Sequence, residues 1–456
     1  MAYGGGKYVV QNKILPGYYF KLLSASKDAI ALSDRGKAAV GLELDWGTDE
    51  KIITVSNGQF QKDAAKYFGY DYGSAKLAPV REVFKNATHL IFYRLNGGGE
   101  KASCKWATAK CSGIRGNDLT IVIAGAVDEP GKYDVFTYLK DEQGNNIRKD
   151  KQRVANVGEL KANDFVEFKT DGVELAEDAG TALTGGTNGT VTGAAHQDFL
   201  AKLERVHYHC LACNSTEATT IALYVEYQKR LSAECGKVAQ CVVYGYSVNG
   251  ETKTEVTPDN YNIIVVENAV VTAGVPEHNG IYWVLGAEAG CAVNKTVQNR
   301  IYNGEYEFFV DYTQDELALK LNKGKFMFHE TINTNDETEI RVLDDVNSFV
   351  TVTEEENSNY KKNQLIRVLY QIITDVGGTF NAKWQGITPN DADGRAAFKG
   401  VIVKYLLQLQ GIRAIQGVDE SRVIVEQGDT KGAVYMAIPC NNVIAMFQCY
   451  NDITVE

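Results

Sequence analysis

The sequence of 456 residues lacks the features that would mark it as a membrane, secreted or nucleic-acid-binding protein. No apolar run approaches the roughly 18–20 residues that a membrane-spanning helix needs. The opening residues, MAYGGGKYVVQNK, contain no basic and apolar leader. An excess of positive charge is also missing, because the net charge is −11. We therefore expect a protein made in the cytosol, without direct membrane insertion and without nucleic acid as a partner.

Regular cysteine spacing and the common catalytic motifs are absent as well. The nine cysteines are an odd number without a repeating interval, which favours free thiols over a disulfide framework. GxSxG, HExxH and EF-hand patterns are not found. The glycine-rich stretches NGGGEK (96–101) and TGGTNGT (184–190) match no phosphate-binding loop and predict turns. The carboxylates of DDVN (344–347) are interpreted as a solvated turn.

One short stretch, RVHYHCLACNS at 205–215, resembles a zinc knuckle or a redox dithiol. If it forms a strand, alternation places Cys210 on the face of Tyr208 and Cys213 on the face of His209. These side chains then cannot converge on one metal ion, and a structural zinc site also needs a second ligand pair. The pattern therefore favours structural thiols, with a metal or redox site as the alternative.

Glycine and tyrosine are abundant beside few prolines: 43 Gly, 25 Tyr and seven Pro. This composition favours strands, turns and aromatic contact surfaces. Residues 1–20 resemble an arm, because a GGG joint, a β-prone piece and a Pro-Gly turn offer too little apolar surface for a core. Strand patterns fill about 101–180, and strands alternate with a helix over 197–303. Helical patterns over 364–380 and 389–411 precede extended segments at the end of the chain.

The C-terminal segment predicts a β-prone arm like that at the N-terminus. Its apolar face comprises Val443, Ala445, Phe447, Cys449, Ile453 and Val455. Such a segment can add a strand to the sheet edge of a neighbouring subunit. Pairing within its own sheet fits the same pattern equally well, so both possibilities stay open.

An ordered set of short stretches covers nearly the whole chain. They are QNKILPGYYF (11–20), LSDRGKAAVGLELDWG (32–47), FGYDYGSAKL (68–77), YRLNGGGEKA (93–102), ATAKCSGIRGNDLTIVI (107–123), LTGGTNGTVT (183–192), GAEAGCAVN (286–294), LNKGKFMF (321–328), VLDDVNSFVTVT (342–353), KKNQLIRVL (361–369), PNDADGRAAFK (389–399) and AIQGV (414–418). Together they resemble the contractile tail sheath proteins of phages, defective prophages and phage-tail-like bacteriocins, in the compact form found in Gram-positive bacteria.

This resemblance implies a non-enzymatic structural protein without a cofactor and with an α+β multidomain fold. An inner mixed α/β domain would be formed by N- and C-terminal parts of the chain, with a β-rich insertion, a small α/β insertion and extended terminal arms. The implied segments are an N-terminal arm (1–20), the inner core (21–100 plus 330–440), the β-rich insertion (101–182), the α/β insertion (183–329) and a C-terminal arm (441–456).

The resemblance also implies the partners. Subunits of this family stack as six-membered rings in a helical array around an inner tube, and the array shortens to drive the tube through a cell envelope. Partners would be other copies, the tube protein, and baseplate and tail terminator proteins. The particle would assemble in the bacterial cytoplasm and be released as a phage or phage-tail-like particle. Arm residues between subunits would include Tyr8, Val9, Val10, Gln11, Asn12 and Lys13.

Basic residues of the last third are candidates for contacts with the tube, although a solvated helix face explains each of them as well. They are Lys361, Lys362, Arg367, Lys399 and Lys404. Two alternatives to the sheath stay open at this point. One is a cytosolic thiol- or zinc-dependent α/β enzyme centred on Cys210 and Cys213, and the other is a different self-assembling shell protein.

Overall fold

The computed structural model describes residues 4–7, 17–20, 30, 32–250 and 252–454. The predicted arm residues 8–13 and Val455 lie outside the described residues. The chain divides into two compact units, one of Asp34–Arg367 and the other of Met1–Ser33 with Val368–Glu456. Within the described ranges, no helix combines the length and the apolar character needed to cross a bilayer.

The larger unit contains a seven-stranded sheet with the strand order β17-β16-β13-β12-β3-β5-β4. Neighbouring strands are parallel except for the edge pair of β4 and β5. The strands are β3 (Lys37–Leu42), β4 (Ile52–Ser56), β5 (His89–Arg94), β12 (Cys210–Ala212), β13 (Gln240–Tyr244), β16 (Ile263–Val266) and β17 (Lys325–Phe326). Most of these strands read as continuous apolar runs, as expected when helices cover both faces of a parallel sheet.

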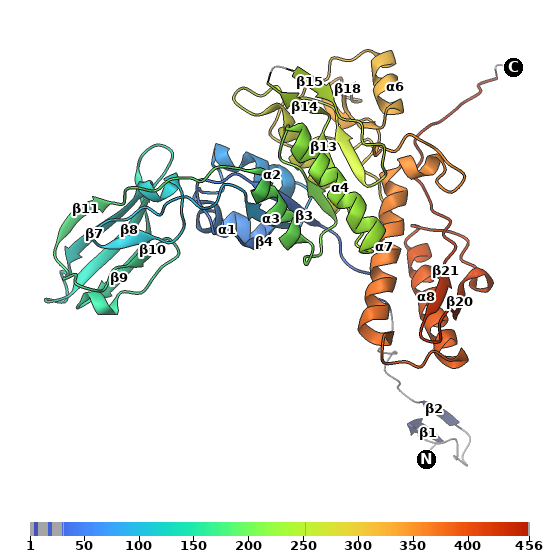
Figure 1. Cartoon of the computed structure of the whole chain (residues 1–456), viewed down its shortest axis with the longest axis horizontal. Coiled ribbons are helices and arrows are strands. Elements are labelled where there is room, and N and C mark those ends of the chain that lie inside the picture. The colour runs from blue at the N-terminus through green and yellow to red at the C-terminus, as the bar shows by residue number, and fades with distance from the viewer. Residues whose placement is uncertain (1–3, 8–16, 21–29, 31, 251, 455–456) are drawn as a thin grey trace. The chain divides into compact units, whose positions relative to one another are not determined.

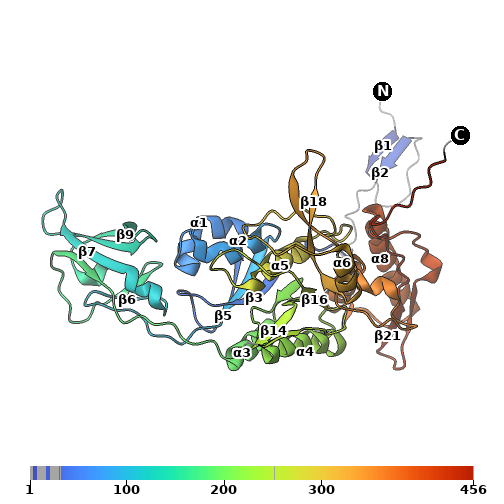
Figure 2. The ribbon, with the colours of Figure 1, turned by 90° about the horizontal axis from the view of Figure 1, so that it is seen from above.

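Helices cover the sheet on both sides (Figures 1 and 2). On one face lie α1 (Asn57–Phe68), α2 (Ala78–Phe84) and α5 (Gly280–Gly290), and on the other lie α3 (Gly193–Leu203) and α4 (Ala218–Glu234). Because side chains alternate along a strand, Ala38 and Val40 of β3 belong to the first core and Ala39 to the second. The predicted helix at the position of α4 is confirmed, and Gly236 with φ 62° follows its end.

The seven-stranded sheet spans a domain boundary that the sequence predicts. Residues 21–100 and 183–329 were assigned to different domains, yet β3 pairs with β5 on one side and with β12 on the other. The terminal unit, in turn, begins at Val368 instead of 330 and includes nothing between Asp34 and Arg367. The order of strands in a parallel sheet depends on long-range pairing, which local patterns do not encode.

A β-sandwich forms a separate core within the larger unit. The four-stranded sheet β11-β7-β8-β9 and the pair β10-β6 enclose apolar side chains such as Ile121, Val135 and Val166. The strands are β6 (Ala107–Ala109), β7 (Leu119–Gly125), β8 (Tyr133–Lys140), β9 (Asn146–Val154), β10 (Val166–Phe168) and β11 (Asp178–Ala182). The mixed α/β sheet and this sandwich confirm the predicted multidomain α+β class.

The two glycine-rich stretches meet where the chain enters and leaves the sandwich. A Cβ at Gly99 would lie 1.9 Å from the carbonyl oxygen of Thr187, and one at Gly189 would lie 1.9 Å from that of Gly97. Gly189 also donates its N–H to the Asn96 carbonyl at 3.1 Å. The glycines are needed because two backbones touch here, which supports a structural role over a phosphate loop.

Two hairpins and a helix complete the larger unit: β14 (Tyr246–Asn249) with β15 (Thr252–Glu255), β18 (Phe328–Ile332) with β19 (Thr338–Val342), and α6 (Gln314–Asn322). The terminal unit contains most of α7 (Asn363–Thr379), then α8 (Ala392–Gly411), the hairpin of β20 (Ile424–Gln427) and β21 (Val434–Ala437), and the parallel pair of β1 (Gly4–Lys7) and β2 (Gly17–Phe20). Both predicted late helices are confirmed. Asp391 caps the start of α8, because its side chain accepts the Gly394 N–H at 2.8 Å.

The end of helix α5 packs so closely on the turn after α2 (Ala78–Phe84) that a methyl group cannot fit between them. A Cβ at Gly290 would lie 2.0 Å from the Asn86 carbonyl oxygen. We expect Gly290→Ala to lower the free energy of unfolding by about 1–3 kcal/mol, measured by urea denaturation. Gly400→Ala in α8, where nothing lies within 4 Å of the added Cβ, is the matched control and should raise it by up to about 1 kcal/mol. Equal effects of the two changes would contradict this packing.

Candidate assembly surfaces

The C-terminal segment of the terminal unit joins no sheet among the residues that the structure describes. Main-chain hydrogen bonds fix the start of the segment: the Gln416 N–H donates to the Asn441 carbonyl at 2.8 Å, and the Val443 N–H donates to the Ala414 carbonyl at 3.1 Å. From Val443 to residue 454 the described chain contains no helix or strand, although the sequence predicts a strand there. A strand exists only when another strand accepts and donates its main-chain hydrogen bonds, and within the described ranges none of the strands is assigned a pairing with residues 443–454.

This segment exposes large apolar side chains to solvent. The exposed fraction is 100% for Met446, 87% for Tyr450 and 82% for Ile453. Phe447 is half exposed and the predicted interface residue Cys449 is exposed, whereas Val443 and Ala445 are partly buried. A run of exposed apolar groups on an extended segment is typical of a surface that another chain covers.

The hairpin of β20 and β21 provides a matching acceptor. It is a two-stranded sheet, so within the described residues each of its strands has one edge without a neighbour. An isolated hairpin is only marginally stable, and a third strand adds main-chain hydrogen bonds to it.

The structure separates the five predicted tube-facing residues. Lys404 on α8 is exposed and Lys399 is half-buried. Lys361 and Lys362 are also half-buried, and Lys362 pairs with Asp344. The positions of the four lysines are compatible with contact to a partner.

Arg367 is different, because its side chain is buried, with 1% exposed. Its guanidinium donates to Glu288 at 2.6 Å and to the Lys295 carbonyl at 2.7 Å, and it lies 3.3 Å from Asp345. A buried guanidinium cannot contact a partner protein, so the prediction of a tube contact for Arg367 is wrong. Arg367 was chosen as a basic residue of the last third of the chain, but the sequence does not show what packs over it.

The sequence alone did not reveal that carboxylates surround Arg367. Asp345 was interpreted as part of a solvated turn, yet it is buried and accepts the Val297 N–H at 3.0 Å. Burial, together with the nearby Asp345, raises the pKa of Glu288 to about 8. Burial alone would raise the pKa of Asp345, but the charge of Arg367 and several hydrogen bonds lower it to about 2. Arg367 and Asp345 are therefore a buried ion pair, and the Glu288 carboxyl lies against the same guanidinium. The only available signal was that Glu288 and Asp345 each fall in a stretch that resembles the sheath family.

The cysteine and histidine stretch is structural. Cys210 belongs to one core and Cys213 to the other, which confirms their predicted opposite faces. Tyr208 lies with Cys213 and not with Cys210, because regular strand begins only at Cys210. Burial raises the pKa of both thiols, so neither is a ready thiolate. His209 accepts the Lys37 N–H through Nδ1 at 3.1 Å. Among the described residues, no group of three or more metal-binding side chains is placed to hold an ion.

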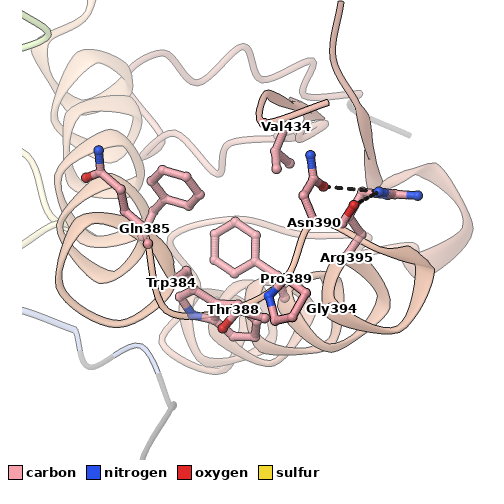
Figure 3. Close-up of a pocket in the computed structure, with 12 residues that line it drawn as sticks. Trp384, Gln385, Thr388, Pro389, Asn390, Gly394, Arg395 and Val434 are labelled. Carbon is pink, nitrogen blue, oxygen red and sulfur yellow. Dashed lines mark hydrogen bonds between the residues drawn. The ribbon is translucent and has the colours of Figure 1, made fainter. Parts of the chain in front are cut away.

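A small hollow of about 110 Å³ lies between the connection from α7 to α8 and strand β21 (Figure 3). Its walls include Trp384, Phe398 and Val434. Arg395 donates to the Asn390 side chain at 3.1 Å, and Asn390 donates in turn to the Ala433 carbonyl at 2.8 Å, which ties the helix start to the hairpin. The hollow offers room for one side chain and contains no catalytic arrangement.

Comparisons with known proteins agree with this architecture. Four family models match consecutive parts of the chain: the tail sheath protein Gp18 domain III N-terminal region (35–95), the phage tail sheath protein beta-sandwich domain (97–188), the phage tail sheath protein central domain (189–348) and the phage tail sheath C-terminal domain (355–456). In chain order, the four matches correspond to the first part of the α/β sheet, the inserted β-sandwich, the second part of the α/β sheet and the terminal unit.

Proteins that align with nearly the whole chain include tail sheath proteins. A sheath tail protein of Desulfitobacterium hafniense is 30% identical, with a TM-score of 0.76 over 93% of this chain and 96% of that one. A sheath tail protein of Listeria innocua is 26% identical, with a TM-score of 0.75 over 91% and 94%. Protein XkdK of the phage-like element PBSX of Bacillus subtilis is 29% identical over 92% of each chain.

The chain therefore belongs to the phage tail sheath protein family, whose members are structural proteins and not enzymes. It is a subunit of a contractile tail sheath, related to sheath proteins of Gram-positive prophages and phage-like elements. The resemblance read from the sequence is confirmed, and the thiol- or zinc-dependent enzyme is excluded as the alternative.

Proposed function

We propose that copies of this chain stack as six-membered rings around an inner tail tube and contract to drive that tube through a target envelope. The terminal segments complete sheets of neighbouring copies, so subunits stay joined while the array shortens. The main support for the proposal is the C-terminal segment after Val443, which exposes Tyr450 and Ile453. Among the described residues, each sheet of the terminal unit has two strands.

Physical reasoning supports each part of this proposal. Contraction exchanges one set of contacts between rigid subunits for another. A subunit tethered by an exchanged strand keeps a high effective concentration near its neighbour, so broken contacts re-form without loss of the subunit. The extended array is then a kinetically trapped state.

The remaining tube-facing candidates are Lys361, Lys362, Lys399 and Lys404. The wider set of partners comprises the tube protein and the baseplate and terminator proteins, within a particle assembled in the bacterial cytoplasm. Membership of the sheath family and the likeness to a protein of the phage-like element PBSX support this setting.

Electron microscopy of the concentrated protein tests the proposal. The full chain should form striated hollow cylinders with sixfold symmetry, and a variant without residues 1–20 should remain a folded monomer. Flat sheets or closed shells from the full chain would refute the sheath arrangement. Cylinders from the shortened chain would refute strand exchange by the N-terminal arm.

A further inference from the structure

A cleft of about 540 Å³ in the larger unit is lined by four lysines. They are Lys51, Lys66, Lys101 and Lys110. The cleft opens beside β4, the last strand of the seven-stranded sheet, since Ile53 of that strand also lines it. Its size falls within the roughly 300–1,000 Å³ of protein ligand sites. The cleft is thus locally basic in a chain whose net charge is −11.

Three of the four ammonium groups have no carboxylate partner within the part of the chain that the structure describes. Lys66 pairs with Asp164 at 2.8 Å, whereas Lys110 donates only to the Asn163 carbonyl at 3.1 Å. Lys51 and Lys101 make no hydrogen bond or ion pair there. The second carboxylate of the cleft, Asp49, is already paired with the buried Arg94 at 3.1 Å. The cleft therefore carries about three uncompensated positive charges.

The chain has one run of three consecutive acidic residues, Glu354–Glu356. None of the three makes an ion pair with any described residue. The run forms a turn, because Thr353 donates its N–H to the Glu356 carbonyl and its hydroxyl accepts the Glu356 N–H, both at 3.0 Å. Because its backbone is already ordered, the turn loses less backbone conformational entropy on binding.

The base of this turn is fixed near the opposite end of the same sheet. Asp259 accepts the N–H of Val350 at 2.7 Å and the Thr351 hydroxyl at 2.6 Å. Ser348 donates to the carbonyl of Ile263, the first residue of β16, at 2.8 Å. Five strand intervals of about 4.8 Å each, or roughly 24 Å, separate β16 from β4. The turn cannot bridge that distance to the cleft of its own copy.

We propose that the lysine cleft binds the Glu354–Glu356 turn of a second copy of this chain. Three uncompensated ammonium groups meet three uncompensated carboxylates, and the match offsets the mutual repulsion of subunits that each carry −11. Phosphate-rich polymers fit less well, because the molecule as a whole, with its net charge of −11, repels long polyanions.

The contact joins two different surfaces from opposite ends of one sheet. Such a head-to-tail interface extends into rings or helical filaments and does not stop at a dimer. The inference rests on the proposed function, to which it adds a specific contact between subunits, and its test separates the two.

Charge reversal tests the contact in the full-length protein. The cleft variant carries Lys51→Glu and Lys101→Glu, the turn variant carries Glu354→Lys and Glu355→Lys, and the swap variant carries all four. We expect the cleft and turn variants each to raise the critical concentration for assembly at least about tenfold, and the swap variant to return it to within about threefold of the wild type. Lys62→Glu with Lys161→Glu, both exposed and outside the cleft, is the matched control and should leave it within about twofold.

Cross-linking between isotopically labelled and unlabelled copies gives a readout that does not require cylinders. A carboxyl-to-amine reagent should join Glu354 or Glu355 of one copy to Lys51 or Lys101 of the other. Such links in a protein that forms no cylinders would support the contact and refute the sheath arrangement. Cylinders without these links, links only within one copy, or a swap variant that fails to recover would overturn the contact and leave the sheath arrangement standing.

Discussion

Replacing Arg367 with methionine is expected to lower the free energy of unfolding by about 3–5 kcal/mol. Methionine fills similar space, but Asp345 is then left buried without the cation that balances it. Removing one member of a buried charge group costs more than the group contributes as a whole, because the remaining charge stays desolvated. Urea denaturation at pH 7, followed by circular dichroism, measures the loss.

A second substitution serves as the control for this charge balance. Adding Asp345→Asn to Arg367→Met removes the orphaned charge and should recover at least about half of the loss. If the double variant is no more stable than Arg367→Met alone, the cost arises from packing and not from charge.

The same cluster makes stability depend on pH. The pKa of Glu288 is raised to about 8 in the folded chain, above the ordinary value of 4.5, by burial and by the nearby Asp345. The folded state therefore holds an extra proton between these values, and this contribution to stability is complete below about pH 4.5 and is lost as the pH rises towards 8. In Glu288→Gln, which keeps the neutral shape, the decline between pH 5 and 8 should be smaller than in the wild type. An unchanged slope would show that Glu288 is ionised throughout.

Ending the chain after Val443 is expected to reduce sedimentable polymer at least about tenfold while the subunit stays folded. The segment removed exposes Met446, Tyr450 and Ile453 in the single copy and forms no helix or strand there. Sedimentation of the concentrated protein measures assembly, and urea denaturation measures the fold.

A single charged substitution in the C-terminal segment tests this prediction at one residue. Ile453→Asp should block assembly in the same way, because Ile453 is 82% exposed alone but would be covered by a neighbour's sheet. Val127→Asp is the matched control: Val127 is 94% exposed in the β-sandwich and outside the arms. Equal assembly of the two variants would refute burial of Ile453 between copies.

Much of the local structure was predictable because it depends on neighbouring residues. Apolar residues at helical spacing predicted α4, α7 and α8, and strand patterns over about 101–180 predicted the strand-rich β-sandwich. Alternation along a strand was enough to separate Cys210 from Cys213 and to argue against a metal site. The family resemblance also came from the ordered stretches of sequence alone, and the comparisons confirmed it.

The sequence by itself determined helices α4, α7 and α8, the strand-rich stretch of the β-sandwich and the family, since propensity and periodicity act over a few residues. Only the tertiary structure decided that β3 lies between β5 and β12, that Arg367 is enclosed by Glu288 and Asp345, and that the lysine cleft and the acidic turn stand at opposite ends of one sheet. Each of these depends on residues far apart in the chain, whose meeting is set by the packing of the whole unit and by the balance of charges removed from water.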